Sequence, residues 1–127
     1  MIDPLSTQRV IDLHIRIIED TSYATEYQFC GLLRDEATLD FIVDGYNMLS
    51  NPFEKAASFL YKVATRHPFM QGNKRLALLG SLMTLDQAGF RITADKGSRY
   101  EFLIAVANNE IDETGVLQWL LNNSVKK

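Results

Sequence analysis

The sequence contains little cysteine and proline and has no long hydrophobic run. Cys30 is the only cysteine in 127 residues, so no disulfide can form within the chain, and a reducing compartment, the cytoplasm, is expected. No apolar run approaches the ~18 residues that span a bilayer, and the N-terminus lacks the basic flank and apolar stretch of a secretory signal. These absences predict a cytoplasmic protein that does not associate with membranes.

Acidic residues are absent from the centre of the chain. The full sequence has 13 basic and 16 acidic residues, and the resulting net charge of −3 argues against general binding to nucleic acids. No Asp or Glu occurs between residues 55 and 85, so this segment carries +5 and leaves −8 for the rest of the chain. A solvated basic face is the simpler interpretation, and an anion-binding site is the alternative. The five basic residues are Lys55, Lys62, Arg66, Lys74 and Arg75.

Length and hydrophobic pattern predict a single all-α domain over residues 1–127. A chain of this length with 46% hydrophobic residues can bury a core without a disulfide or a metal. Apolar side chains recur at helical spacing along most of the sequence, which predicts a bundle of about six helices. The expected helices cover residues 6–20, 32–43, 52–66, 73–88, 97–108 and 113–123, and after the centre only residues 90–93 have the pattern of a strand.

The sequence predicts one helix boundary clearly, at residues 51–54, and leaves another open, at residues 44–45. Asn51, Pro52 and Glu54 have the order of an N-cap, a first and a third helical position, so a helix is expected to begin there. Asp44 and Gly45 interrupt the preceding apolar pattern, either as the end of a helix or as the turn of a hairpin. The strands of that hairpin would be Phe41-Ile42-Val43 and Tyr46-Asn47-Met48, and the pattern alone does not separate the two interpretations.

The two histidines have different expected roles. Pro68 ends the helix over residues 52–66 and leaves His67 at its C-terminal end. An imidazole can take a proton from a hydroxyl near neutral pH, so His67 is a candidate general base. Phe69 is expected to anchor the following loop in the core. His14 lies beside the apolar stripe of the first helix and is expected to be a partly buried structural residue.

The start of the next helix has the composition of an anion site. Its first turn carries Lys74 and Arg75, although acidic residues are favoured at the positive end of a helix dipole. Gly72 lets a ligand approach the backbone, whose N–H groups donate there. Phosphate is the expected anion, and Asn73 is expected either to cap the helix or to coordinate a phosphate-bound Mg²⁺.

The segment from His67 to Arg75 resembles the signature of the Fic/Doc family, His-x-Phe-x-Asp/Glu-Gly-Asn-Gly/Lys-Arg. Six of the nine positions match at the required spacing, and Pro68 is common at the second. Lys74 and the Leu76-Ala77-Leu78-Leu79 that follows it resemble the Doc (death-on-curing) branch. The similarity extends to the opening helix, to the start of the helix that precedes the motif and to the approach to the last helix, at Leu5–His14, Phe53–Ala57 and Asn109-Glu110-Ile111.

This resemblance implies an all-α fold with a short flap along the substrate groove, for which residues 44–50, with Gly45, Tyr46 and Asn47, are the candidates. It implies that His67 is the general base for a hydroxyl of a target protein. The nucleotide phosphates would be held by Gly72, Asn73, Lys74 and Arg75. ATP would be the co-substrate and Mg²⁺ the metal. The lysine form of the loop implies transfer of the terminal phosphate, with elongation factor Tu as the target, arrested translation as the outcome and a Phd-like antitoxin as the restraining partner.

Two features depart from the family pattern. Gln71 stands where the family has the Asp or Glu that coordinates Mg²⁺, and a neutral amide is a poorer ligand for this cation. Gln71 could still coordinate weakly, another acid could reach the site, or the protein could bind nucleotide or a partner without turnover. An AMP transferase of the Fic type is a further alternative. The glycine-rich segment common in Doc proteins is replaced by Thr21–Phe29.

Overall fold

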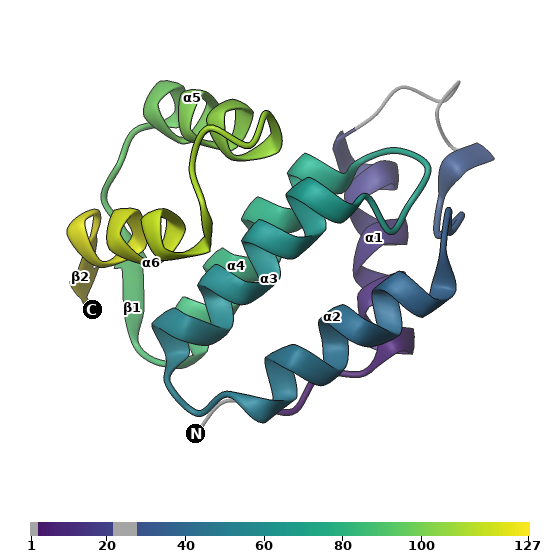
Figure 1. The fold of residues 1–127 in the computed structure, drawn as a ribbon, viewed down its shortest axis with the longest axis horizontal. Helices are drawn as coiled ribbons and strands as arrows, with labels where there is room; N and C mark the ends of the chain where they lie inside the picture. The colour runs from purple at the N-terminus through teal and green to yellow at the C-terminus, as the bar shows by residue number, and fades with distance from the viewer. Residues whose placement is uncertain (1–2, 22–27) are drawn as a thin grey trace.

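The computed structural model describes residues 3–21 and 28–127. These residues form six helices and two short strands, which confirms the predicted all-α fold (Figure 1). No described helix has the length and apolar character needed to cross a membrane. The elements are α1 (Thr7–Thr21), α2 (Glu36–Met48), α3 (Pro52–Arg66), α4 (Asn73–Gln87), β1 (Phe90–Ile92), α5 (Lys96–Ala107), α6 (Glu113–Asn122) and β2 (Ser124–Lys126).

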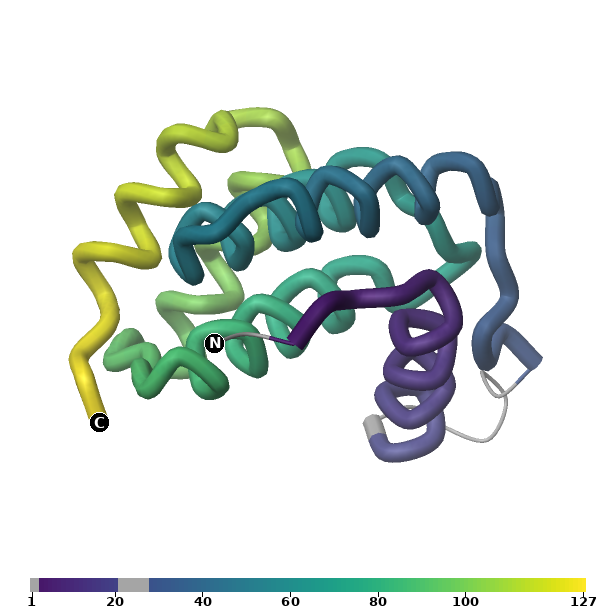
Figure 2. The backbone as a smooth tube through the Cα atoms, turned by 90° about the horizontal axis from the view of Figure 1, so that it is seen from below, coloured from purple at the N-terminus to yellow at the C-terminus, as the bar shows by residue number. Residues whose placement is uncertain are grey.

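Helix α3 is the centre of the bundle. It packs against α2, α4, α5 and α6, and its buried residues include Ala56, Leu60 and Val63, none of which is exposed to solvent. Figure 2 shows α2, α3 and α4 running along a common direction, while α1 crosses them steeply at one end. The loop between α3 and α4 reaches this end, beside α1 (Figure 1). Residues 67–72 therefore connect α3 and α4, the two helices that pack most extensively against each other.

Local sequence signals set several helix starts, and the start predicted at Asn51 is confirmed. The Asn51 side chain accepts hydrogen bonds from the backbone N–H groups of Phe53 and Glu54, with Pro52 in the first turn of α3. Asp112 caps α6 by accepting from the N–H of Gly115. These interactions span two or three residues, so the sequence pattern alone is sufficient to locate them.

The prediction that Asp44 and Gly45 end a helix or form a hairpin turn is wrong, because α2 continues to Met48. The buried residues Leu39, Ile42, Val43 and Tyr46 lie at helical spacing and carry the helix through the glycine. Gly45 has no left-handed φ, and the only atom near a Cβ built there is Nζ of Lys62, the end of a flexible side chain, so the glycine is accommodated within the helix without forming a turn. Residues 44–48 are therefore helical, and no flap forms there. The N-terminal boundary also differs, since the helix begins after Asp35 rather than at residue 32.

A small sheet closes the C-terminal end of the chain. The predicted strand over residues 90–93 is present as β1, and it pairs antiparallel with β2, with Phe90 opposite Lys126 and Ile92 opposite Ser124. The sequence pattern did not indicate β2, whose three residues are Ser-Val-Lys and are mostly exposed. β2 therefore forms because it pairs with β1, and its own three residues lack the alternating hydrophobic pattern of a strand.

The predicted solvated basic face is wrong for Lys55. This side chain is 7% exposed, and its ammonium group donates to the carbonyl of Tyr46 at 2.8 Å and lies 4.4 Å from the centre of the Tyr46 ring. Burial lowers the pKa of Lys55 from its ordinary value. Tyr46 lies in the last turn of α2, where a cation is favoured by the helix dipole. Lys62, by contrast, is partly exposed and lies 5.3 Å from the ring of Phe41.

Gly80→Ala is expected to lower the free energy of unfolding by about 1–3 kcal/mol, the usual cost of overpacking. A Cβ at this position would overlap the ring of Phe59 on α3, and Phe59 is itself buried and cannot move away freely. Urea denaturation followed by circular dichroism measures the loss. Gly97→Ala in α5 is the matched control, because the nearest atom is 3.6 Å away and alanine favours the helix. Equal stability of the two variants would contradict the expectation.

Candidate active site

His67 ends helix α3 in a left-handed conformation, with φ 49° and ψ 65°. Its backbone N–H donates to the carbonyl of Val63, which completes the last helical turn. The left-handed residue and Pro68 turn the chain out of the helix and leave the His67 side chain exposed. The predicted position of His67 at the end of this helix is confirmed.

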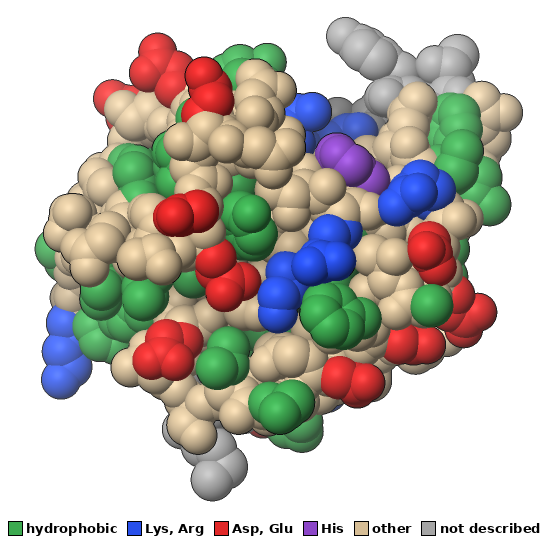
Figure 3. All heavy atoms as spheres, viewed as in Figure 1, with side chains coloured by type: hydrophobic (Ala, Val, Ile, Leu, Met, Phe, Trp, Pro, Cys, Tyr) green, Lys and Arg blue, Asp and Glu red, His purple; other side chains and the backbone are tan. Residues whose placement is uncertain are grey.

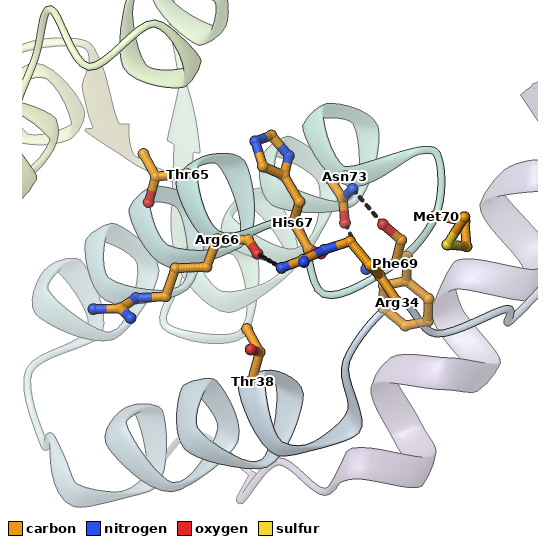
Figure 4. Close-up of a pocket in the computed structure, with 8 residues that line it drawn as sticks. All are labelled: Arg34, Thr38, Thr65, Arg66, His67, Phe69, Met70 and Asn73. Atoms are coloured by element: carbon orange, nitrogen blue, oxygen red, sulfur yellow. Dashed lines mark hydrogen bonds between the residues drawn. The ribbon is translucent and has the colours of Figure 1, made fainter.

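Arg34 fixes the end of α3 from the opposite side of the loop. Its Nε donates to the carbonyl of His67 at 2.6 Å and its Nη2 donates to the carbonyl of Arg66 at 2.7 Å (Figure 4). A guanidinium at a helix C-terminus satisfies carbonyls that lack partners in the helix and is favoured by the helix dipole. The sequence analysis missed Arg34, because its hydrogen-bond partners, Arg66 and His67, lie more than thirty positions away in the chain.

A groove of ≈ 630 Å³ opens beside His67. In Figure 4 the imidazole of His67 points away from Arg34 and lies on the same side as Thr65 and Asn73. On the surface the exposed histidine is bordered by Lys and Arg side chains (Figure 3). The lining residues are Arg34, Thr38, Thr65, Arg66, His67, Phe69, Met70 and Asn73.

The loop that follows His67 is held by a short antiparallel pairing with the chain before α2. Leu33 and Phe69 form an isolated β-bridge, and the N–H of Met70 donates to the carbonyl of Leu32 at 3.1 Å. The N–H of Arg34 donates to the carbonyl of Pro68 at 2.8 Å. The side chains of Leu32 and Met70 are about half exposed at this edge. Residues 32–34, predicted to be helical, are therefore the chain segment that borders the loop.

Asn73 closes the loop from within. Its Oδ1 accepts from the N–H of Phe69 at 3.0 Å, and its Nδ2 donates to the carbonyl of Phe69 at 2.9 Å. Asn73 is 8% exposed and is the first residue of α4, while the N-cap is Gly72 without a side-chain hydrogen bond. The prediction that Asn73 caps the helix is therefore wrong. The expected role in metal coordination also lacks support, because both amide atoms are engaged with the backbone of Phe69.

His14 joins helix α1 to the loop. Its ring stacks on Phe69 with 3.9 Å between centroids and 5° between planes, and both residues are fully buried. Nε2 lies 2.7 Å from the carbonyl oxygen of Gln71, and Nδ1 accepts from the N–H of Gly31 at 2.9 Å. Burial is the main cause that lowers the pKa of His14, the hydrogen bond to the carbonyl of Gln71 opposes this shift, and the positive charge of Arg75 adds to it. The expected structural role is confirmed, and Phe69 anchors the loop as predicted.

The start of α4 has the predicted features of an anion site. Gly72 is left-handed with φ 79°, and no acidic residue occurs in the first turn of the helix. Lys74 is exposed and Arg75 is partly exposed. The N–H groups in a first helical turn lack acceptors within the helix, and the helix dipole favours an anion there. These residues are placed so that they can bind phosphate.

The donor set around the loop does not fit a Mg²⁺ ion held by the protein. The side chain of Gln71 is exposed and neutral, and the amide of Asn73 is occupied. Among residues 3–21 and 28–127, no group of three or more His, Cys, Asp or Glu side chains is arranged for metal binding. Mg²⁺ prefers carboxylate and phosphate oxygens. The predicted metal role of Gln71 thus has no carboxylate partner in the described part of the chain.

The residues predicted for a flap lie in helix α2 and do not line this groove. Tyr46 is buried, and its hydroxyl is hydrogen-bonded to that of Thr84 at 2.9 Å. The side chain of Asn47 binds both backbone polar groups of Leu5. Neither residue, nor Gly45, lines the groove beside His67. Of the segment Thr21–Phe29, residues 22–27 lie outside the described part of the chain.

Comparison with known proteins identifies one family. The model of the Fic/DOC family matches residues 4–85, which include α1 to α3, most of α4 and the whole loop between His67 and Arg75. No curated protein matches the chain.

Proposed function

Because this chain belongs to the Fic/DOC family, we propose that it transfers the terminal phosphate of ATP to a hydroxyl group of a target protein. The observation that carries this proposal is the position of His67, exposed at the end of α3 on a groove that also reaches the first residue of α4. Of this helix start only Asn73 lines the groove, and the proposed phosphate-binding residues Lys74 and Arg75 follow it directly in the first turn of α4. Phosphoryl transfer depends on a general base and an anion site, because the protein contributes mainly positioning and charge stabilisation.

In the proposed reaction His67 accepts the proton of the target hydroxyl. The hydroxyl oxygen then forms a bond to the γ-phosphorus, the bond from that phosphorus to the β–γ bridging oxygen breaks, and ADP leaves. Lys74 and Arg75 neutralise the phosphate charge, with Arg75 suited to a bidentate contact, and the N–H of Gly72 and the first turn of α4 donate to phosphate oxygens. No step in this reaction is assigned to a metal ion.

The target is proposed to enter along the groove beside His67. The half-exposed side chain of Met70 adds an apolar surface to the groove, which Arg34 and Arg66 also line (Figure 4). Such a mixed surface suits a protein segment better than a small molecule. Elongation factor Tu is the proposed target, with arrested translation as the consequence, and a Phd-like antitoxin is the proposed restraining partner. Both proposals rest on the lysine form of the loop at position 74.

Two other functions are alternatives, and a specific observation favours the second of them. Transfer of AMP instead of phosphate would use the same histidine and the same loop, with the nucleotide bound in the opposite direction. A nucleotide- or partner-binding protein without turnover is favoured by the exposed amide at Gln71 and by the engaged amide of Asn73. Intact His67 and the cationic first turn of α4 favour the enzyme.

Incubation with ATP labelled at either the α or the γ position, in the presence of purified elongation factor Tu or cell extract, separates these functions. We expect protein-bound label from γ-labelled ATP only, because the β–γ bond is the one that breaks. Label from the α position alone would establish AMP transfer and contradict the proposal. Binding of ATP without label transfer from either position would identify a binding protein.

A further inference from the structure

His14 contacts the anion-binding loop without access to a substrate. It is fully buried in α1, it stacks on Phe69, and each of its ring nitrogens has a backbone partner. A ring with both nitrogens occupied and no exposed surface has no free site for proton exchange with a ligand. Any contribution of His14 to function must therefore act through the residues that it holds.

The partners of His14 define which nitrogen carries the proton. The N–H of Gly31 can only donate, so Nδ1 is the acceptor and is unprotonated. Nε2 then carries the hydrogen and donates to the carbonyl oxygen of Gln71 at 2.7 Å. The two hydrogen bonds therefore have different consequences: one holds the segment at residue 31, and the other holds the loop.

The hydrogen bond to Gln71 fixes the orientation of a peptide group. In a trans peptide the C=O of one residue and the N–H of the next point in opposite directions, and the described chain contains no cis peptide. The carbonyl of Gln71 points inward to the buried His14, so the N–H of Gly72 points outward. Gly72 lies directly on the histidine, because a Cβ there would be 3.2 Å from Nε2. The N–H at the N-cap of α4 is thereby directed away from the core.

We propose that His14 is a positioning residue for the phosphate site: its Nε2–H holds the peptide between Gln71 and Gly72 so that the N–H of Gly72 donates to a phosphate oxygen of ATP. This role rests on the proposed function, because it assumes that the loop binds the phosphates of ATP. Without the hydrogen bond the peptide is free to rotate, and its carbonyl oxygen would then face the anion and repel it.

Two substitutions at position 14 separate the two hydrogen bonds. Glutamine places its amide nitrogen near the position of Nε2 and can still donate to the carbonyl of Gln71. Asparagine places its side-chain oxygen near the position of Nδ1 and can still accept from the N–H of Gly31. Both variants lose the ring that stacks on Phe69 and retain one of the two hydrogen bonds, so they form a matched pair in stability. Only His14→Asn loses the hold on the loop.

Isothermal titration with ATP, together with thermal unfolding of each variant, tests the proposal. We expect the Kd for ATP to rise at least tenfold in His14→Asn and to stay within about threefold of wild type in His14→Gln, at similar melting temperatures. Equal affinities in the two variants, or losses that follow the melting temperature, would overturn the role of His14. Absence of ATP binding by wild type would overturn the proposed function, and this inference with it.

A measurement on the wild-type chain covers the case in which a variant does not fold. In ¹H–¹⁵N spectra the amide proton of Gly72 is expected to shift downfield when ATP is added, as a new hydrogen bond to an anion requires. The ring nitrogens of His14 are expected to show the Nε2–H form before and after addition. An unchanged Gly72 amide in the presence of bound ATP, or a change of the His14 ring to the Nδ1–H form, would contradict the proposal.

Discussion

His67→Ala is expected to lower the rate of phosphate transfer by about 10²–10⁴-fold, the usual contribution of a positioned general base. The side chain is exposed at the end of α3, and the hydrogen bonds that hold the loop are made by Arg34, Asn73 and His14 instead. The loss should therefore appear in the transfer rate and not in ATP binding. Transfer from γ-labelled ATP and titration with ATP measure the two quantities separately.

The conformation of His67 determines the proper control. Its φ of 49° is left-handed, a region that costs energy for most residues but is tolerated by asparagine. His67→Asn should therefore retain the backbone of wild type and still be inactive. Free imidazole added to His67→Ala should restore part of the rate, because the groove beside this position is open to solvent. Full activity of either variant would show that another group accepts the proton.

Local signals explain what the sequence could predict. The caps at Asn51 and Asp112 involve contacts within three residues, and Pro68 directly determines where α3 can end. His67 was placed correctly for the same reason, since its position at the helix end depends only on its neighbours. The helix start at Gly72 is likewise readable from the order of residues, and the phosphate site proposed there remains a prediction.

Contacts between distant residues explain the rest. The bond between His14 and the carbonyl of Gln71 joins positions 57 apart, and no periodicity indicates it. Asp44 and Gly45 were interpreted as a helix end or a hairpin turn, because the packing of Ile42, Val43 and Tyr46 that carries α2 past them cannot be read locally. Asn73 has the sequence position of a cap, but the path of the loop brings its amide to Phe69 first. In each case tertiary packing, rather than local preference, determines what the side chain does.

Gln71→Glu is expected to make phosphate transfer depend on Mg²⁺ and to raise its rate at millimolar Mg²⁺ by about 10²-fold, since a metal at a phosphoryl oxygen is worth several kcal/mol. The side chain at position 71 is exposed on the loop, and the contact that Gln71 makes with His14 involves its backbone carbonyl, which the substitution leaves in place. The substitution therefore adds a carboxylate, the ligand that Mg²⁺ prefers, without removing a contact that holds the loop. Transfer from γ-labelled ATP with Mg²⁺ or with EDTA measures both effects.

Gln71→Ala is the matched control, because it removes the amide without adding a charge. If the amide does not bind a metal, this variant and wild type should have the same rate, and only Gln71→Glu should respond to EDTA. The expectation is contradicted if EDTA already lowers the wild-type rate and Gln71→Glu does not raise it. The neutral amide of Gln71 would then be sufficient to bind the metal. A third outcome is that wild type transfers no phosphate and Gln71→Glu does. This would mean that His67, Lys74 and Arg75 can support the reaction, and that position 71 alone separates a nucleotide-binding protein from an enzyme. The size of the response therefore distinguishes the two functions that the loop supports.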